Sequence, residues 1–401
     1  MRWGGSHTRP FDFADHSGLE RPELIMSAET AKPREPARGH VHALTDLDEP
    51  AMERLAVSLG EPPFRGRQLF GWVHDRLETE LERMSNLPRD FGRRLGGRHL
   101  PATAEREDEL VSADGTTRKR LLRLADGARV EAVLMSASAS RRDSDRHTVC
   151  VSSQVGCALG CTFCVTGQVG FARQLSPGEI VEQVYHFERA LCQESDAGPA
   201  GRDRRFVTNV VFMGMGEPLS NYESVMAAVR LLVSPKGFGL GARHITVSTA
   251  GLTPGIERLS RESLQLGLAI SLHAADDELR SRLMPINRRF PLAGLLKAAR
   301  GYAETTGRRV SYEYALMEEV NDGVAQARKL ASLLSGQLCH VNLIPLNRSL
   351  DPSLKPSTPR QVASFKRALE SEGVPCTLRQ TKGEDILAAC GQLRYTATHE
   401  C

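Results

Sequence analysis

Apolar and polar residues change their spacing along the chain, and the spacing divides it into patterned regions behind a polar tail. Residues 1–42 show no apolar period and are rich in Pro, Gly, His and Arg, a composition typical of a disordered tail. Over residues 43–104 apolar side chains recur at helical spacing, as at Leu69, Val73 and Leu77. This region is predicted to be a small helical N-terminal domain.

A short β segment is predicted between the helical region and the rest of the chain, over residues 105–146. Within Arg120–Met135, the dipeptide Asp126-Gly127 separates two apolar runs. Asp-Gly favours the left-handed backbone of a two-residue turn, so it is a strong signal for a β-hairpin. We therefore expect residues 105–146 to form a β-hairpin connector.

From residue 147 onward, β-branched or apolar runs alternate with amphipathic helical stretches. The six runs that predict strands are Thr148–Ser153, Asn209–Gly214, His244–Thr249, Leu266–His273, Arg309–Leu316 and His340–Pro345. The first helical stretch begins at Ser176-Pro177-Gly178-Glu179, a capping box with Pro in the first turn. Six β/α units in series indicate a parallel sheet with fewer strands than a closed barrel. We predict an α/β fold in which residues 147–395 form a partial (β/α)6 barrel, with reactive groups at the carboxyl ends of its strands.

Composition excludes several classes of protein. The 401 residues are 40% hydrophobic and 25% charged, as in soluble globular proteins. No apolar run of about 18 residues occurs, and the N-terminus lacks the apolar core of a signal peptide. Nine cysteines without a secretory signal favour a reducing compartment, where cysteines serve as metal ligands or catalytic thiols. We therefore expect a cytoplasmic protein that does not associate with membranes.

The charge of the chain leaves its partner open. A net charge of +3 permits a nucleic-acid partner without requiring one. Arginines are concentrated in the predicted N-terminal domain, namely Arg65, Arg67, Arg76, Arg83, Arg89, Arg93, Arg94 and Arg98. Such a group could contact RNA phosphates without reading the base sequence. It is equally compatible with a solvated helical surface, so both interpretations stay open.

Three cysteines lie close together in the loop after the first predicted strand. Cys157, Cys161 and Cys164 have the spacing C-x3-C-x2-C. Iron–sulfur clusters normally have four Cys ligands, so three thiolates would leave one iron open for another ligand. Zinc sites usually need a second Cys or His pair, but the nearest other cysteines are Cys150, seven residues upstream, and Cys192, far downstream. The spacing therefore favours a cluster over zinc.

Polar groups follow several of the other predicted strands. Gly214–Pro218 ends the second strand and contains Gly216, which lets a ligand approach the backbone, and Glu217, which could accept a hydrogen bond from an ammonium group. Further candidate ligand contacts at strand ends are Ser248, Ser271, Leu272, His273 and Asn347. Each also has a structural interpretation, but their shared place at one end of a barrel favours ligand binding.

Two cysteines outside the motif occupy positions where a thiol could react. Cys150 lies in the first predicted strand. Cys390 lies between Ala389 and Gly391, small neighbours that would let its thiol approach a substrate closely. The alternative is that both cysteines are small buried hydrophobic residues.

In these residues the chain resembles the RlmN/Cfr family of radical S-adenosylmethionine (SAM) methyltransferases, which methylate an RNA adenine, and it is most similar to RlmN. The similar stretches are Pro63–Trp72, Val130–Leu134, Thr148–Thr166, Gly170–Leu175, Gly214–Pro218, Ile245–Gly251, Ala269–Ala274, Val341–Asn347 and Thr381–Leu393. The three-cysteine motif together with Cys150 and the ACGQL stretch around Cys390 is specific to this family. Leu387, Gln174 and Lys382 depart from the family pattern, in which Asp, Asn and Arg are usual.

The resemblance implies a mechanism that uses two SAM molecules. A [4Fe-4S] cluster on the three motif cysteines binds one SAM, which the polar strand-end residues contact, and cleaves it to a radical. Cys390, methylated by the other SAM, loses a hydrogen atom to that radical and adds to the adenine. Cys150 then resolves the protein–RNA crosslink by forming a disulfide with Cys390, and Glu131 accepts a proton.

The resemblance also implies substrates and partners. Methylation is expected at carbon 2 of an adenosine in the peptidyl-transferase centre of 23S rRNA and of an adenosine in the tRNA anticodon loop. The enzyme would be a monomer, would take electrons from a flavodoxin-type donor and would contact RNA through residues 43–104. Two alternatives stay open: a Cfr-type methyltransferase that acts on carbon 8, and a non-catalytic iron–sulfur or zinc module that binds RNA.

Overall fold

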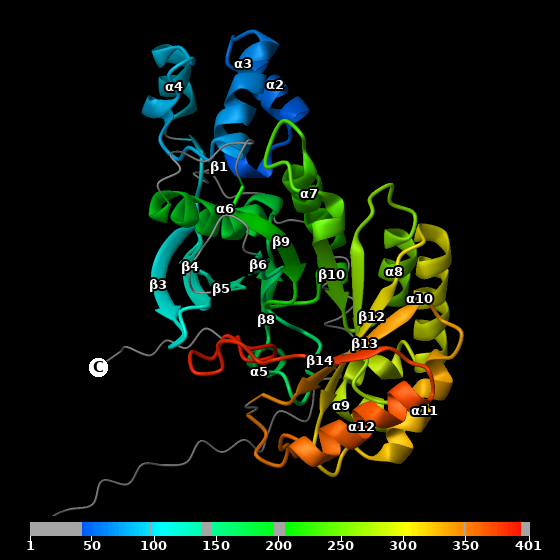
Figure 1. Cartoon of the computed structure of the whole chain (residues 1–401). Helices are drawn as coiled ribbons and strands as arrows, with labels where there is room; N and C mark the ends of the chain where they lie inside the picture. The colour runs from blue at the N-terminus through cyan, green and yellow to red at the C-terminus, as the bar shows by residue number, and fades with distance from the viewer. Residues whose placement is uncertain (1–41, 97, 138–145, 196–204, 348–349, 394–401) are drawn as a thin grey trace, which may run out of the picture.

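One mixed sheet of ten strands runs through the molecule (Figure 1). The computed structural model describes residues 42–96, 98–137, 146–195, 205–347 and 350–393. The predicted disordered tail therefore lies outside the described residues, apart from residue 42. The strand order across the sheet is β14-β13-β12-β11-β10-β9-β6-β5-β4-β3.

Seven neighbouring strands of this sheet are parallel. They are β6 (His147–Cys150), β9 (Val207–Phe212), β10 (Ile245–Thr249), β11 (Gly267–Ser271), β12 (Val310–Leu316), β13 (Cys339–Pro345) and β14 (Cys376–Leu378). The first six coincide with the predicted strands, which confirms the α/β class and the order of the β/α units. β14 was not predicted, because it is a strand of three residues without a buried apolar run.

Helices connect the parallel strands and cover the outer face of the curved sheet (Figure 1). They are α6 (Pro177–Glu194), α7 (Tyr222–Val233), α8 (Thr253–Leu259), α9 (Asp277–Leu283), α10 (Leu292–Thr306), α11 (Val324–Leu334) and α12 (Pro359–Ser371), with short helices η4 (Pro218–Asn221), η5 (Ala242–His244) and η6 (Pro285–Arg288). The predicted capping box is present at the start of α6, where Ser176 and Glu179 each accept the other's backbone N–H. None of the described helices is both long enough and apolar enough to cross a bilayer.

The β segment before the barrel is longer than a hairpin and joins the barrel sheet. It consists of β3 (Glu105–Val111), β4 (Thr117–Arg123) and β5 (Arg129–Ser136), paired antiparallel in sequence order. Gly127 has φ +82° in the turn between β4 and β5, as the Asp-Gly signal predicted. β5 also pairs antiparallel with β6, with Val133 opposite Cys150. The segment therefore extends the barrel sheet at the edge that carries the first barrel strand.

The N-terminal region is helical, as predicted. It contains α2 (Glu49–Ser58), α3 (Pro63–Phe70), α4 (Arg89–Leu95) and the short helices η1 (Leu44–Asp46), η2 (Gly71–Asp75) and η3 (Leu81–Arg83), framed by the two-residue strands β1 (His42–Ala43) and β2 (His99–Leu100). Leu69, Val73 and Leu77 are all buried, as the apolar spacing predicted. Leu69 on α3 and Val73 on η2 are helical, but Leu77 lies beyond η2 with φ +57°, so the helical face ends before it. The Asp48 side chain caps α2 by accepting from the Ala51 N–H.

One buried carboxylate fastens both ends of the N-terminal region to the barrel. Glu182 on α6 accepts from the Thr45 hydroxyl at 2.5 Å, from the Ala104 N–H at 2.6 Å and from the Thr103 N–H at 3.0 Å. Thr45 lies in η1, before α2, and Thr103 follows α4, so the Glu182 side chain binds the chain both before and after these helices. His74 adds a second buried link, a hydrogen bond of 2.8 Å to the Tyr185 hydroxyl.

Replacing Glu182 by Gln should loosen the N-terminal helices without unfolding the barrel. An amide nitrogen cannot accept a hydrogen bond, so at least one buried donor would lose its partner, at a cost of about 1–3 kcal/mol. We expect faster amide hydrogen exchange in residues 42–104 than in β9 to β13. Glu188→Gln is the matched control, because Glu188 is equally buried on α6 but accepts from the Phe206 and Val207 N–H groups. Equal exchange in the N-terminal region of both variants would contradict this role of Glu182.

Candidate active site

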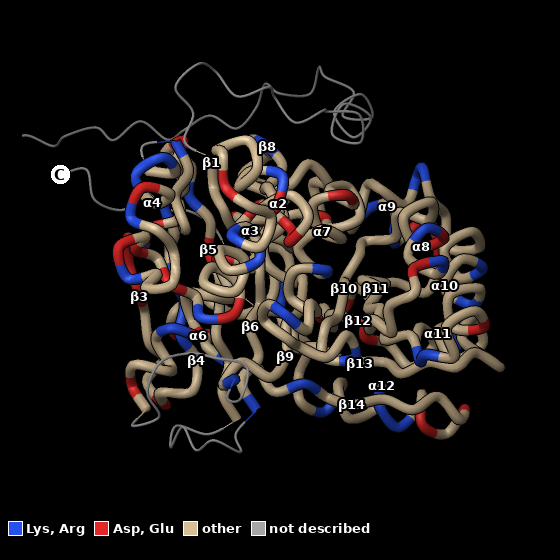
Figure 2. Tube along the Cα trace, turned by 90° about the horizontal axis from the view of Figure 1, so that it is seen from above, with Lys and Arg blue, Asp and Glu red and all other residues tan. Residues whose placement is uncertain are grey.

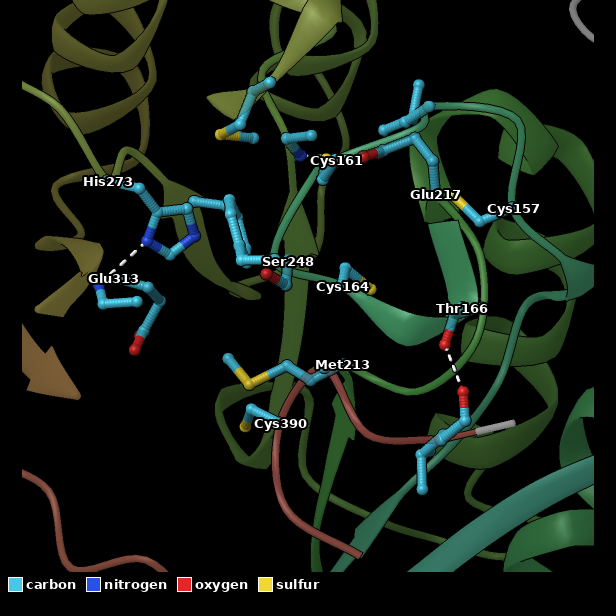
Figure 3. Close-up of a pocket in the computed structure, with 18 of the residues that line it drawn as sticks. Cys157, Cys161, Cys164, Thr166, Met213, Glu217, Ser248, His273, Glu313 and Cys390 are labelled. Atoms are coloured by element: carbon cyan, nitrogen blue, oxygen red, sulfur yellow. Dashed lines mark hydrogen bonds between the residues drawn. The ribbon is translucent and has the colours of Figure 1, made fainter. Parts of the chain in front are cut away.

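A cavity opens where the parallel strands end, and it gathers most of the predicted site residues (Figure 3). Cys157, Cys161, Cys164, Gly216, Glu217, Ser248, Ser271, His273, Asn347 and Cys390 all line it. These residues come from the carboxyl ends of different strands and from the loops after them, so the fold brings them together as a barrel predicts. Three predicted residues do not line the cavity: Cys150, Glu131 and Leu272.

The loop with the three motif cysteines lies between β7 (Gln154–Gly156) and α5 (Val165–Val169) and is closed by β8 (Phe171–Gln174). The Cys157 N–H donates to the Gly170 carbonyl at 2.7 Å. Gly156 has φ +78°, and a side chain there would collide with that same carbonyl. The tight turn at Gly156 therefore aims Cys157 into the cavity, where Cys161 and Cys164 also point (Figure 3).

The three thiols have the chemistry of an iron–sulfur ligand set. Burial raises the pKa of Cys157 to about 12 and raises the pKa values of Cys161 and Cys164 as well. Metal ligation would convert each to a thiolate. Among the described residues, no three His, Cys, Asp or Glu side chains converge as ligands of a single ion. A [4Fe-4S] cluster takes one thiolate at each of its four irons, so three separate thiols that face one cavity fit it better than they fit zinc.

Glu217 forms the wall of the cavity next to this loop. Its two carboxylate oxygens accept from the Leu219 N–H at 3.0 Å and the Ala250 N–H at 2.7 Å. Burial raises the pKa of Glu217 to about 7. Gly216 has φ +100°, and a side chain there would strike Gln154, whose amide oxygen accepts the Glu217 N–H. Glycine is thus required immediately before the carboxylate.

His273 and Arg280 shape the opposite wall. Nδ1 of His273 accepts the Ala315 N–H at 2.9 Å, and burial lowers the pKa of His273 to about 3, so the ring is neutral with its proton on Nε2. The fully buried Arg280 donates to the carbonyls of Ala250, Ser271 and Leu272. Leu272 thus contributes its backbone to the site, while its side chain is buried.

The loop that carries Cys390 forms hydrogen bonds with the start of α5 and with the residue Asn347 after β13. The Val165 N–H donates to the Gly391 carbonyl at 2.8 Å, and the Thr166 hydroxyl donates to the Leu393 carbonyl at 2.5 Å. The Asn347 amide donates to the Cys390 carbonyl at 3.1 Å. The Cys390 side chain is exposed and lines the cavity. A thiol from the C-terminal loop therefore faces the motif cysteines, which is the feature that most restricts the chemistry of this site.

Cys150 and Glu131 lie behind the cavity wall. Burial, and to a smaller extent a negative charge on Cys390, raises the pKa of Cys150 to about 12. Glu131 on β5 forms an ion pair with Lys119, whose ammonium also donates to the Leu387 carbonyl at 3.1 Å. Lys119 thus links Glu131 to the Cys390 loop.

Known proteins with similar sequences support the resemblance that the motifs and the site geometry indicate. A model described as "Radical SAM superfamily" matches residues 151–331, and one described as "Ribosomal RNA large subunit methyltransferase N-terminal domain" matches residues 42–98. A protein of Moorella thermoacetica named "Probable dual-specificity RNA methyltransferase RlmN" is 50% identical over 347 residues, which cover 86% of this chain and 95% of that protein. A protein of Frankia alni with the same name is 49% identical and covers 93% of this chain and 89% of its own length.

This chain belongs to the RlmN family. A solved structure agrees: the crystal structure of a radical SAM methyltransferase from Sphaerobacter thermophilus has a TM-score of 0.82 and 45% sequence identity, and the match covers 88% of this chain and 99% of that one. The resemblance seen in the sequence is therefore confirmed.

Two charged residues of this RlmN-family site carry no motif in the sequence. Glu313, a single acid within the apolar strand β12, lines the cavity. It accepts from the Asn342 amide at 2.8 Å and lies 3.5 Å from Arg379. An acid inside an otherwise buried apolar run is itself a signal, since a buried charge needs partners. Arg280 had a weaker signal, because it lies on an amphipathic helix among other charged residues.

The expected arginine surface is partly neutralised. Four of its arginines form ion pairs, namely Arg67 with Glu53, Arg83 with Glu80, Arg93 with Asp90 and Arg94 with Glu61. Figure 2 accordingly shows acidic and basic residues close together on the N-terminal helices. Arg76 instead packs over the Trp72 ring, 4.1 Å from its centroid. The remaining arginines leave both interpretations of this surface open.

Iron uptake by the metal-free protein should become stronger as the pH rises. Burial raises the pKa values of all three motif thiols, so each thiol must lose a proton to become a ligand. We expect more iron bound at about pH 8.5 than at about pH 7, with protons released into a weakly buffered solution during anaerobic reconstitution. Cys376→Ala, which changes a half-buried thiol outside the cavity, should leave both readouts unchanged. Iron uptake that is independent of pH would contradict the protonated state of these thiols.

Proposed function

We propose that this chain is a SAM-dependent methyltransferase that methylates carbon 2 of an adenosine in 23S rRNA and in the tRNA anticodon loop. The observation that carries the proposal is Cys390, a thiol on a C-terminal loop that faces three motif cysteines across one cavity. Ordinary radical chemistry at a cluster needs no such thiol, whereas methyl transfer through a protein thioether does. The names of the RlmN relatives, which describe dual-specificity RNA methyltransferases, support the RNA substrates.

The residues of the cavity divide between two tasks. Cys157, Cys161 and Cys164 would hold a [4Fe-4S] cluster, and Glu217 would receive the ammonium group of SAM, beside the other predicted contacts Gly216, Ser248, Ser271, Leu272, His273 and Asn347. When bound, the cluster and SAM supply a one-electron cleavage, which is needed because carbon 2 of adenine is electrophilic and does not attack a sulfonium. A flavodoxin-type protein is the proposed electron donor.

The two reactive thiols have different environments that suit different steps. Cys390 is open to the cavity, so it can reach a sulfonium methyl group and then the base. Cys150 is buried with a raised pKa, so it stays protonated and unreactive until a partner is close. We assign methyl transfer to Cys390 and resolution of the protein–RNA crosslink, by formation of a disulfide with Cys390, to Cys150. The predicted proton acceptor Glu131 remains a candidate that acts at a distance from the cavity.

The target adenine must leave its stack to enter the cavity. Recognition of unstacked bases is typical of RNA enzymes that modify a base. The N-terminal helices, which Glu182 fastens to α6, are the proposed contact for the flanking RNA backbone. Those of their arginines that form no ion pair with a described residue would supply electrostatic attraction without reading the sequence.

Mass spectrometry of digested RNA tests the proposal directly. RNA from cells that express this protein should contain 2-methyladenosine that is absent from cells without it. Separation from 8-methyladenosine decides against the Cfr-type alternative. If the protein binds RNA but forms neither methylated product, the non-catalytic alternative applies. In that case the anaerobically reconstituted protein should also fail to cleave SAM to 5′-deoxyadenosine.

Replacing each thiol should stop the reaction at a different point. Cys390→Ala removes the methyl carrier, so SAM cleavage should continue while methyl transfer falls below detection. Cys150→Ala leaves the carrier intact, so a covalent protein–RNA adduct should accumulate and be visible as a shifted band after denaturing electrophoresis. Cys192→Ala is the matched control, because Cys192 is a buried thiol on α6 outside the cavity. Free methylated RNA from the Cys150 variant would refute its role.

A further inference from the structure

The cavity holds few groups that could take a proton from a substrate. Its titratable lining residues in the described part of the chain are four cysteines, Glu217, His273 and Glu313. Three of the cysteines are the motif cysteines, and the fourth, Cys390, is the proposed methyl carrier. A base for the RNA substrate must therefore come from the remaining three residues or from outside the cavity.

Two of these three are engaged elsewhere. Both carboxylate oxygens of Glu217 are held by backbone N–H groups, beside the motif cysteines where SAM would lie. The Nδ1 atom of His273 is occupied by the Ala315 N–H, and its other nitrogen carries the ring proton, so the neutral ring offers no free lone pair. Burial lowers the pKa of His273 to about 3, which makes the ring a poor base as well.

Glu313 is placed and held differently. Glu313 has 5% of its surface exposed, and it lines the same cavity as Cys390 (Figure 3). One carboxylate oxygen accepts from the Asn342 amide at 2.8 Å, while the other is 3.5 Å from the nearest Arg379 nitrogen. Among the residues that the structure describes, the second oxygen has only this long contact, which leaves it capacity to accept another proton or hydrogen bond.

We propose that Glu313 is the catalytic residue that accepts the proton leaving carbon 2 of the target adenosine. This assignment rests on the proposed function. After the methylene group has added to carbon 2, the carbon–hydrogen bond breaks, its electron pair stays in the ring, and the proton moves to the Glu313 carboxylate. One electron must also leave the adduct, and an oxidised [4Fe-4S] cluster held by Cys157, Cys161 and Cys164 would be its acceptor.

The same group can return a proton when the crosslink is resolved. The Cys150 thiol gives up its proton, which leaves to solvent, and the resulting thiolate attacks the Cys390 sulfur. A sulfur–sulfur bond forms, and the bond from Cys390 to the methylene carbon breaks. The electron pair of the broken bond goes to that carbon, which takes a proton from Glu313 and becomes the methyl group. The carboxylate is thereby regenerated, and atoms and electrons balance over both steps.

The charges around Glu313 set the pH dependence of these steps. Arg379 on the segment after β14 faces it and lowers its pKa, Asn342 on β13 donates to it, and Cys390 on the C-terminal loop and His273 after β11 share its cavity. Burial outweighs these effects and raises the pKa of Glu313 above that of an ordinary glutamate. A base must be deprotonated, so methylation should fall as the pH drops through this raised pKa.

The test compares Glu313→Gln and Glu313→Asp with the wild-type enzyme, all reconstituted anaerobically with cluster, SAM and an RNA substrate. Removing a general base typically costs about 10²–10⁴-fold in rate. We expect Glu313→Gln to reduce 2-methyladenosine at least about 100-fold, while methylation of Cys390 and 5′-deoxyadenosine formation stay within about twofold. The aspartate variant should retain part of the activity and shift the acid limb of the pH–rate profile. Glu318→Gln, just beyond β12 and outside the cavity, is the matched control.

Each outcome decides the assignment. Loss of Cys390 methylation and SAM cleavage together with RNA methylation in Glu313→Gln would show a structural role and overturn it. RNA methylation at the wild-type rate in Glu313→Gln would also overturn the assignment. So would a Glu131→Gln variant that cleaves SAM and methylates Cys390 but forms no 2-methyladenosine, if Glu313→Gln does not show the same block. If the wild-type enzyme itself forms no 2-methyladenosine while cleaving SAM, the proposed function fails, and the assignment fails with it.

Discussion

The parallel alignment of β6 with β9 to β14 is the constraint on which the site depends. Parallel strands all end at the same edge of a sheet, so loops that are distant in sequence open toward one place. The motif cysteines follow β6, Glu217 follows β9, and His273 follows β11, and all line one cavity. Arg280 makes this arrangement rigid, because its guanidinium binds carbonyls at the ends of both β10 and β11. Without that buried cation, several strand-end carbonyls would be left without a hydrogen-bond donor, which is costly in a buried site.

The position of Cys390 depends on a different principle. Its loop follows the last strand and is held by hydrogen bonds that join residues more than 200 positions apart, such as Thr166 to Leu393. The loop also rests on the antiparallel strands, where Lys119 donates to Leu387, Lys382 donates to Ser136, and Asp385 accepts from Ala113. The β segment that precedes the barrel therefore serves as the support for the reactive loop. This explains why it continues the barrel sheet rather than forming a separate unit.

The sequence predicted those features that a local pattern determines. The six barrel strands are apolar runs, the start of α6 is a capping box, and the cysteine spacing is set by ligand geometry, so each was visible. β3 was missed because six of its seven residues are exposed and they include four acidic or basic side chains in succession, so no alternation marks it. The partners of Glu131, Glu313 and Arg280 could not be predicted, because they are side chains brought close by long-range contacts. Leu387 shows a further limit: it has φ +52°, a conformation that Asp or Asn adopts at lower cost, and only the fold reveals why Asp is usual there.

The two carboxylates of the cavity show how one residue type can serve two tasks. Both Glu217 and Glu313 are almost fully buried, and burial raises the pKa of each. Glu217 is surrounded by backbone N–H groups that cannot move without moving η4 and the end of β10, so its geometry is fixed. Glu313 is held by side chains, an amide and a more distant guanidinium, which can shift as a base enters. A backbone cradle suits a ligand that must be held in place, and a side-chain cradle suits a group whose protonation changes. The difference between the two proposed roles therefore follows from what donates to each carboxylate, not from how deeply it is buried.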